Sequence, residues 1–178
     1  MAKFLFLSEK KNDKMISFLK ERGQVTWMDR KINLEDVKDF DWIISFGYRN
    51  IISKNIIDKT KNKIINLHIS YLPYNRGANP NYWSFKENTP KGVSIHFIDE
   101  GIDTGPILLQ SLCEFDESHT LKSSYNILIQ TIENLFFDNF DKIMNGKVKS
   151  KPQVGNGTYH KKNDLLNNIN YNTKIKEI

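Results

Sequence analysis

The sequence has few of the features that mark secreted, membrane-spanning or thiol-dependent proteins. Its 178 residues include one cysteine, Cys113, which excludes an internal disulfide and a cysteine-based metal cluster. The N-terminal stretch MAKFLFLSEKK has an apolar run of four residues, too short for a signal peptide, and no later run approaches a membrane span. We therefore expect a cytoplasmic protein without a membrane partner.

Glycine is missing from SEKKND, the turn that follows the first apolar segment. A phosphate-binding loop of the nucleotide-binding kind is therefore not expected there. His96, His119 and His160 lack ligand spacing to one another, so no zinc site is indicated. The acidic loop DEGIDTG (99–105) does not fit a calcium loop, because its sixth position is not Gly and its twelfth is Gln110. The sequence predicts no bound metal.

Positive charge is concentrated in one part of the chain. The formal net charge is +5, but residues 142–178 hold eight lysines against Asp164 and Glu177 and so carry +6, which leaves −1 for the rest. A lysine-rich segment of this kind is usually solvated, so no nucleic-acid partner is expected. We predict one globular domain over residues 1–149, followed by a loosely packed basic extension over residues 150–178.

Short apolar segments alternate with helical patterns in the first half of the chain. Strands are expected at 4–8, 25–29, 41–48 and 63–69, and helices at 12–22 and 53–61. After residue 79 we expect a helix that begins at Asn79-Pro80, strands at 93–99 and 106–115 that pair antiparallel, and a long helix at 123–146 that ends at Gly146. Alternation of strands and helices indicates an α/β fold with a mostly parallel sheet and helices on both faces.

Two polar side chains interrupt the apolar strand at 63–69. Asn66 and His68 lie two positions apart, so they point to one side of the strand near its carboxyl end, where ligand crevices form in open α/β sheets. Taken alone, the pair is more typical of a capped strand end with a satisfied histidine than of a functional site. In the same way, the loop 99–105 alone is typical of a hairpin whose carboxylates cap backbone amides.

Three stretches in order match a known family. INLHISYLP, NRGANPNYW and GVSIHFIDEGIDTGPIL together resemble the formyltransferases that use 10-formyltetrahydrofolate, whose members act on methionyl-tRNA, glycinamide ribonucleotide or nucleotide-linked sugar amines. The similarity is dense from residue 41 to 112 and weaker to 146. Three motifs at sensible spacing are far more specific than one. The resemblance implies a Rossmann-like α/β fold with an antiparallel C-terminal part.

The resemblance also implies where the site residues lie. The family's catalytic trio falls on Asn66, His68 and Asp103. The implied folate-binding residues are Phe46, Gly47, Tyr48, Arg49, Asp99, Glu100, Gly101 and Ile102. The expected acceptor-binding residues are Tyr74, Arg76, Gly77, Asn79, Tyr82 and Trp83, a set rich in aromatic side chains that can stack on a flat ring or a sugar.

The implied chemistry explains why these residue types are needed. An amine attacks the formyl carbon, and the Asn66 amide and a protonated His68 donate to the developing oxyanion. Removal of one such donor typically costs about a hundredfold to a thousandfold in rate. Asp103 is expected to hold His68 and its proton in place and to help move the proton that the amine loses. No metal takes part.

Departures from the family pattern favour one acceptor class. The tRNA-modifying members carry a second domain of about a hundred residues, an ordinary domain size, and only some thirty follow the catalytic region here. Glycinamide ribonucleotide enzymes grip a phosphate with a Gly-rich turn that SEKKND lacks. The part before Asn66 is also short by about one strand–helix unit. We expect N-formylation of a nucleotide-linked amino-deoxy sugar for surface glycan synthesis, by a protein that forms a homodimer.

Other functions stay open at this point. Within the family, the acceptor is alternatively methionyl-tRNA or a small amine such as glycinamide ribonucleotide, or the formyl folate is hydrolysed. From another class, the chain is a non-catalytic module that binds folate or a nucleotide sugar. The intact trio argues against that last alternative, because a binding module has no need of all three side chains.

Overall fold

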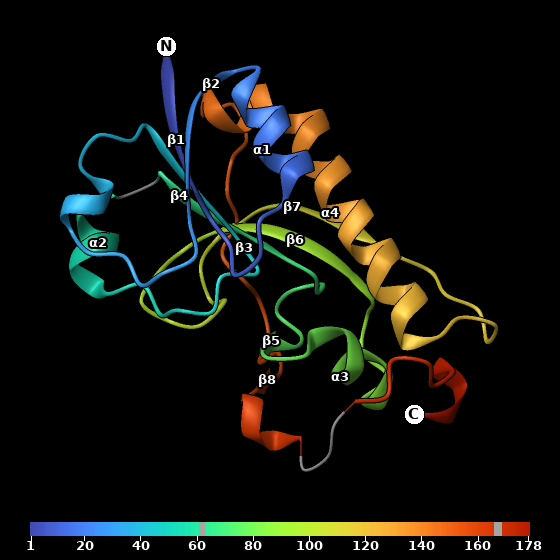
Figure 1. Ribbon diagram of the computed structural model, residues 1–178. Helices are drawn as coiled ribbons and strands as arrows, with labels where there is room; N and C mark the ends of the chain where they lie inside the picture. The colour runs from blue at the N-terminus through green and yellow to red at the C-terminus, as the bar shows by residue number, and fades with distance from the viewer. Residues whose placement is uncertain (61–62, 166–168) are drawn as a thin grey trace.

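A six-stranded mixed sheet forms the centre of this computed structural model, which describes residues 1–60, 63–165 and 169–178 (Figure 1). The spatial strand order is β2-β1-β3-β4-β6-β7. The strands are β1 (Ala2–Leu7), β2 (Gly23–Met28), β3 (Trp42–Phe46), β4 (Ile64–His68), β6 (Gly92–Phe97) and β7 (Ile107–Leu112). The first four pair in parallel, whereas β6 is antiparallel to both β4 and β7. The predicted α/β class and its antiparallel C-terminal part are confirmed.

Helices cover both faces of the sheet, as the alternation of strands and helices predicts. α1 (Asp13–Lys20) and α4 (Leu121–Met144) pack side by side over one face, where they enclose the larger apolar core (Figure 1). α2 (Lys54–Lys59) and the 3-10 turn η1 (Glu35–Val37) cover a smaller core on the other face. None of the helices in the described ranges is both long and apolar enough to cross a bilayer.

Local capping explains where the two main helices begin. The side chain of Asn12 accepts a hydrogen bond from the Met15 amide and so starts α1, as its sequence indicates. α4 begins two residues before the predicted position, because Thr120 and Ser123 form a reciprocal capping box. It ends just before Gly146, whose φ of 65° suits the predicted stop.

The other predicted elements are present with shifted ends. The predicted strands 41–48 and 63–69 are each shorter in the structure, since the chain turns into the loops that border the site. The predicted helix 53–61 is α2, and residue 61 lies outside the described part of the chain. The helix expected at Asn79-Pro80 is α3 (Pro80–Lys86).

The C-terminal segment folds back onto the domain. β8 (Tyr159–His160) pairs in parallel with β5 (Arg76–Gly77), and single bridges join Lys151 to Ile107 and Lys174 to Thr120. These contacts join the described part of residues 150–178 to the domain, and that part also includes the 3-10 turns η2 (Lys162–Asp164) and η3 (Ile175–Glu177). The division of the chain into a domain over 1–149 and an extension over 150–178 stays a prediction. Isolated bridges and two-residue strands leave no hydrophobic periodicity in the sequence. The contacts between the C-terminal segment and the domain could therefore not be predicted from it.

Candidate functional site

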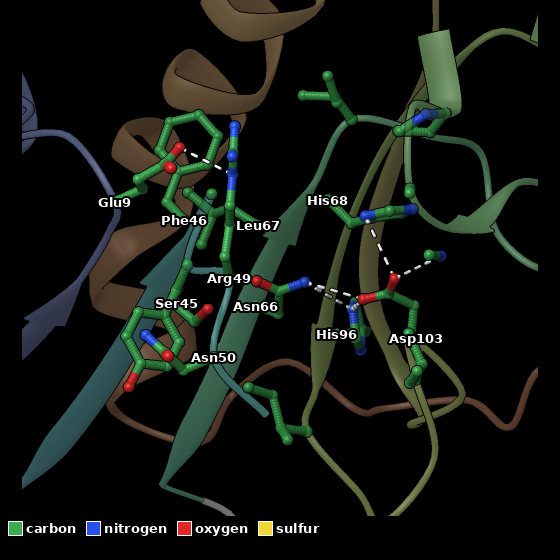
Figure 2. Close-up of a pocket in the computed structure, with 18 of the residues that line it drawn as sticks. Glu9, Ser45, Phe46, Arg49, Asn50, Asn66, Leu67, His68, His96 and Asp103 are labelled. Atoms are coloured by element: carbon green, nitrogen blue, oxygen red, sulfur yellow. Dashed lines mark hydrogen bonds and ion pairs between the residues drawn. The ribbon is translucent and has the colours of Figure 1, made fainter. Parts of the chain in front are cut away.

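A cleft of about 570 Å³ opens at the carboxyl ends of β3 and β4 (Figure 2). Asn66 and His68 of β4 point into it from one side of the strand, as their spacing predicts. His96 of β6 and Asp103 of the loop between β6 and β7 complete the group. The structure therefore brings the predicted trio together and adds a second histidine.

The Asp103 carboxylate is the centre of this group. Its Oδ1 accepts a hydrogen bond from Asn66 Nδ2 at 3.1 Å, and its Oδ2 accepts one from the Gly77 amide at 2.9 Å. His96 Nε2 lies 3.4 Å from Oδ1, and His68 Nδ1 lies 3.7 Å from Oδ2. Figure 2 shows the carboxylate between the two rings and the Asn66 amide. One side chain thus connects β4, β5 and β6.

The surroundings of Asp103 keep it ionised. Burial alone would raise the pKa of this carboxyl, but the charge of His68, the hydrogen bond and charge of His96, and the Gly77 amide outweigh it and hold the pKa below its ordinary value. A group of this kind remains a carboxylate at neutral pH. It is then available to accept hydrogen bonds and to stabilise a cation beside it.

The His68 ring is oriented by a backbone carbonyl. Its Nε2 donates to the carbonyl oxygen of Asn75 at 3.0 Å, and because a carbonyl only accepts, Nε2 carries the hydrogen. In the neutral ring Nδ1 is then unprotonated, and it faces Asp103 across 3.7 Å. That distance is too long for a hydrogen bond. Asp103 therefore acts on His68 through its charge, whereas the sequence led us to expect that it holds the ring.

His96 is the site residue that sequence reasoning missed. It lies directly opposite Asn66 in the β4–β6 pairing, and its Nε2 is 3.3 Å from Asn66 Nδ2. The ring is 1% exposed, and its Nδ1 donates to the Phe97 carbonyl at 2.8 Å. The sequence held no signal for this contact, because the predicted antiparallel pairing joins 93–99 to 106–115 and does not say which strand lies beside Asn66 or in which register.

Most of the residues expected to bind folate border the cleft, and two do not. Those that line it are Phe46, Gly47, Tyr48, Arg49, Asp99 and Ile102. Glu100 instead pairs with Lys54 of α2, outside the cleft lining. Gly101 packs against Thr104 within the loop, where its amide donates to Asp99 Oδ1.

The far side of the cleft from Asp103 carries an ion pair. Arg49 Nε lies 2.8 Å from Glu9 Oε2, and Figure 2 shows both residues on the side of Asn66 that faces away from Asp103. Apolar side chains are exposed at the same cleft: Ile51 is 75% exposed and Ile102 is 43% exposed. Exposed apolar groups beside a cavity are typical of a ligand-binding site.

The residues expected to bind the acceptor are divided. Gly77 and Asn79 line the cleft, but the Arg76 guanidinium is bonded to Gln153 and Tyr74 lies outside the lining. Tyr82 and Trp83 border a separate cavity of about 470 Å³ beside α3. Trp83 also stacks on His160 of β8, with ring centroids 4.0 Å apart.

Two further cleft residues had no sequence signal. Lys162 of η2 and Tyr125 of α4 both line the cleft, and they come from segments far from the three family motifs. The basic C-terminal segment thus supplies a cation to the cleft that also holds the trio.

Comparison with solved structures gives a close likeness. The chain is similar to the formyltransferase PseJ from Anoxybacillus kamchatkensis, with 40% identity and a TM-score of 0.93 over 99% of this chain and 97% of that chain. That structure is a complex with UDP-4,6-dideoxy-4-formamido-L-AltNAc and tetrahydrofolate. Phosphoribosylglycinamide formyltransferase from Bacillus halodurans shares the fold, with a TM-score of 0.68 at 18% identity over 80% of this chain and 95% of that chain.

Curated relatives come from two acceptor classes. Methionyl-tRNA formyltransferase from Thermodesulfovibrio yellowstonii is 37% identical over 78% of this chain and 46% of its own length. A dTDP-4-amino-4,6-dideoxyglucose formyltransferase from Mycobacterium tuberculosis is 31% identical over 74% of this chain and 55% of its own. This chain spans about half the length of the curated relatives it matches. The formyl transferase family pattern matches residues 10–138, which include all three motifs of the resemblance, and the chain belongs to that family.

Proposed function

We propose that this protein transfers a formyl group from 10-formyltetrahydrofolate to the 4-amino group of a UDP-linked 4-amino-4,6-dideoxy sugar. The observation that carries the proposal is the likeness to the Anoxybacillus formyltransferase over nearly the whole of both chains, because that protein holds a UDP-linked 4-formamido sugar and tetrahydrofolate. The sequence-based expectation of a nucleotide-sugar acceptor points the same way. The homodimer expected from the sequence stays a prediction.

The cleft fits a folate. Its walls include the backbone from Phe46 to Arg49, which suits hydrogen bonds to a pterin ring, and the apolar side chains of Ile51 and Ile102. Both isoleucines are exposed, so a flat ring laid against them would remove apolar surface from water. A bound folate would supply the formyl group for transfer.

Asn66 and His68 are assigned the polar work of the transfer. One hydrogen of Asn66 Nδ2 is directed at Asp103, which fixes the orientation of the amide. The second hydrogen, with His96 Nε2 3.3 Å from the same nitrogen, is assigned to turn to the formyl oxygen as negative charge develops on it. His68 Nδ1, unprotonated in the neutral ring, accepts the proton that the acceptor amine loses as its nitrogen bonds to the formyl carbon. The same proton then passes to the folate nitrogen as its bond to that carbon breaks.

Asp103 stabilises the charged form of His68. The carboxylate lies 3.7 Å from Nδ1 and is 13% exposed, so its attraction to an imidazolium is only weakly screened by water. The imidazolium can also donate from Nδ1 toward the formyl oxygen. The Asn75 carbonyl prevents the ring from turning while this happens.

Lys162 is assigned to the diphosphate of the acceptor. Of the lysines and arginines in the described part of the chain, Arg49 and Lys162 line the cleft, and Arg49 is already paired with Glu9. Among the described residues Lys162 takes part in no ion pair, and Asn79 and Gly77 of the expected acceptor site line the same cleft. An ammonium group without a counter-ion beside the cleft suits a phosphate group.

A second candidate acceptor is methionyl-tRNA, which the 37% identity to the Thermodesulfovibrio relative favours. The test is to incubate the purified protein with 10-formyltetrahydrofolate and, in separate reactions, a UDP-linked 4-amino-4,6-dideoxy sugar, its dTDP-linked counterpart, glycinamide ribonucleotide and methionyl-tRNA. Mass spectrometry detects the formamide product, and absorbance detects tetrahydrofolate. We expect the UDP-linked amine to be formylated at the highest kcat/KM. If every amine stays unmodified while folate and nucleotide sugar still bind, a binding module is the better description.

A further inference from the structure

Gln153, in the C-terminal segment, uses its whole side-chain amide to connect two parts of the site. Its Nε2 donates to the carbonyl oxygens of Asp103 at 2.8 Å and Gly105 at 2.9 Å. Its Oε1 accepts from Arg76 Nε at 3.0 Å and Arg76 Nη2 at 2.7 Å. A glutamine amide has two donor hydrogens and two acceptor lone pairs, so its capacity is filled. Carbonyls only accept and guanidinium only donates, which fixes the orientation of the amide.

The hydrogen bonds that Gln153 donates and those that it accepts both affect the position of the Asp103 carboxylate. One end holds the carbonyl of Asp103 itself, which has a φ of 53°. A left-handed conformation is unfavourable for a residue with a side chain and persists where the surroundings impose it. The other end holds Arg76, and the next amide along the chain, that of Gly77, donates to Asp103 Oδ2. Gln153 thus sets both the backbone of Asp103 and a donor to its carboxylate.

The segment that carries Gln153 is held against the sheet by contacts outside the site. Lys151 pairs with Ile107 of β7 through two backbone hydrogen bonds of 2.7 and 2.8 Å, two residues before Gln153. Gln153 is half-buried, whereas its neighbours Pro152 and Val154 are exposed. Among these three residues, Gln153 is therefore the one shielded from solvent, and its side chain faces the loop between β6 and β7 that carries Asp103.

We propose that Gln153 is a positioning residue for formyl transfer, which acts by holding Asp103 in its left-handed conformation against Asn66 and His68. The inference rests on the proposed function. It makes the C-terminal segment part of the catalytic apparatus rather than an appended tail. A purely structural role, in which Gln153 merely ties the segment to the domain, predicts a different pattern of effects.

The test uses two variants of the full chain and a matched control. Gln153→Glu keeps the size of the side chain and its contact with Arg76 but cannot donate to the two carbonyls. Gln153→Met keeps the length of the side chain and makes none of the four hydrogen bonds, without adding charge. Asn156→Asp, on an exposed residue of the same segment, repeats the amide-to-carboxylate change away from the site. We expect both Gln153 variants to lower kcat by roughly tenfold to a hundredfold, as misplacement of a catalytic group does.

Whether kcat changes alone or together with KM and the melting temperature decides between a positioning role and a purely structural role. Positioning predicts a fall in kcat with the KM values for folate and nucleotide sugar and the melting temperature close to wild type, and an unchanged Asn156→Asp. An unchanged kcat in the folded Gln153 variants overturns the inference, as does a parallel change in kcat, both KM values and melting temperature. If the wild-type protein formylates no amine, the proposed function itself is wrong, and the role of Gln153 is then wrong as well. That result differs from an active wild type with unchanged Gln153 variants, which overturns the inference alone.

Discussion

Nδ2 of Asn66 lies 3.1 Å from Oδ1 of Asp103, so the carboxylate determines which end of the amide is nitrogen. The same carboxylate faces His68 Nδ1, and its other oxygen accepts the Gly77 amide. The orientation of the Asn66 amide and the position of the loop that carries Asp103 therefore depend on one negative group, which also faces the His68 ring (Figure 2). Substitutions around it should affect catalysis more than folding.

Replacement of Asp103 by Asn should lower kcat by about a hundredfold to a thousandfold, because the imidazolium of His68 loses its counter-charge and one of the two oxygens that accept from the Asn66 and Gly77 amides becomes an NH2 donor. Single-turnover kinetics with saturating folate and nucleotide sugar would measure the change. Asp99→Asn, in the same loop and also at the cleft, is the matched control, for which we expect a smaller effect on kcat. Equal losses in the two variants would contradict the central role of Asp103.

Replacement of Asn66 by Asp tests the same contact from the other side. It places a second carboxylate within hydrogen-bonding distance of Asp103, so that one group must take up a proton or the pair must separate. We expect kcat to fall by about a hundredfold or more, since the donor to the formyl oxygen is lost as well. Asn50→Asp brings the same charge into the same cleft on the side away from Asp103. If the two variants retain similar kcat values, charge in the cleft explains the loss and the specific contact does not.

The turn that supports Tyr48 gives a prediction about pH. Arg30 binds both oxygens of Asp36, at 2.8 and 2.6 Å, while its carbonyl accepts from the Tyr48 hydroxyl at 2.8 Å. The hydrogen bond from Arg30, helped by the Asn33 amide, outweighs burial and lowers the pKa of Asp36 to about 2. Because the folded pKa is lower than that of a free carboxyl, about 3.9, the ionised group stabilises the fold above about pH 4 and loses this effect as pH falls towards 2.

Asp36→Asn should therefore lower the melting temperature at pH 7, and the difference from wild type should shrink as the pH approaches 2. Thermal unfolding followed by circular dichroism across that range measures it. Asp39→Asn, on an exposed side chain of the same turn region, controls for the change in net charge. A difference that stays constant with pH would show that the ion pair does not contribute.

Local patterns were sufficient to predict the fold class and the shared orientation of Asn66 and His68 on their strand. The i, i+2 spacing of Asn66 and His68 on an apolar strand defines their shared side, whatever the rest of the chain does. Alternating strand and helix patterns define the layers, and the capping signal at Asn12 is local too. The role of Asp103 came from the family resemblance, since a carboxylate in a glycine-flanked loop is otherwise typical of a simple turn.

Contacts between segments that are distant in the chain could not be predicted from the sequence. The position of His96 opposite Asn66 depends on the register of an antiparallel pair, which a one-residue slip would change. The Asn75 carbonyl that orients His68 belongs to the backbone and has no residue-type signature. Gln153 follows the isolated bridge at Lys151 and Lys162 follows the two-residue strand β8, and neither contact needs a periodic pattern in the sequence.

The assignment of Lys162 makes a selective prediction about the acceptor. Lys162→Ala should raise the KM for the nucleotide sugar roughly tenfold to a hundredfold, the cost of one charge-assisted hydrogen bond of about 1.5–3 kcal/mol, while the KM for folate stays the same. The rise should lessen at high ionic strength, where the wild-type attraction to phosphate is itself screened. Lys161→Ala removes an identical charge from the neighbouring residue, which lies outside the cleft lining, and should leave both KM values unchanged. If the two lysine variants weaken the acceptor equally, the general positive charge of the segment attracts the nucleotide sugar; if the folate KM rises instead, Lys162 belongs to the other substrate.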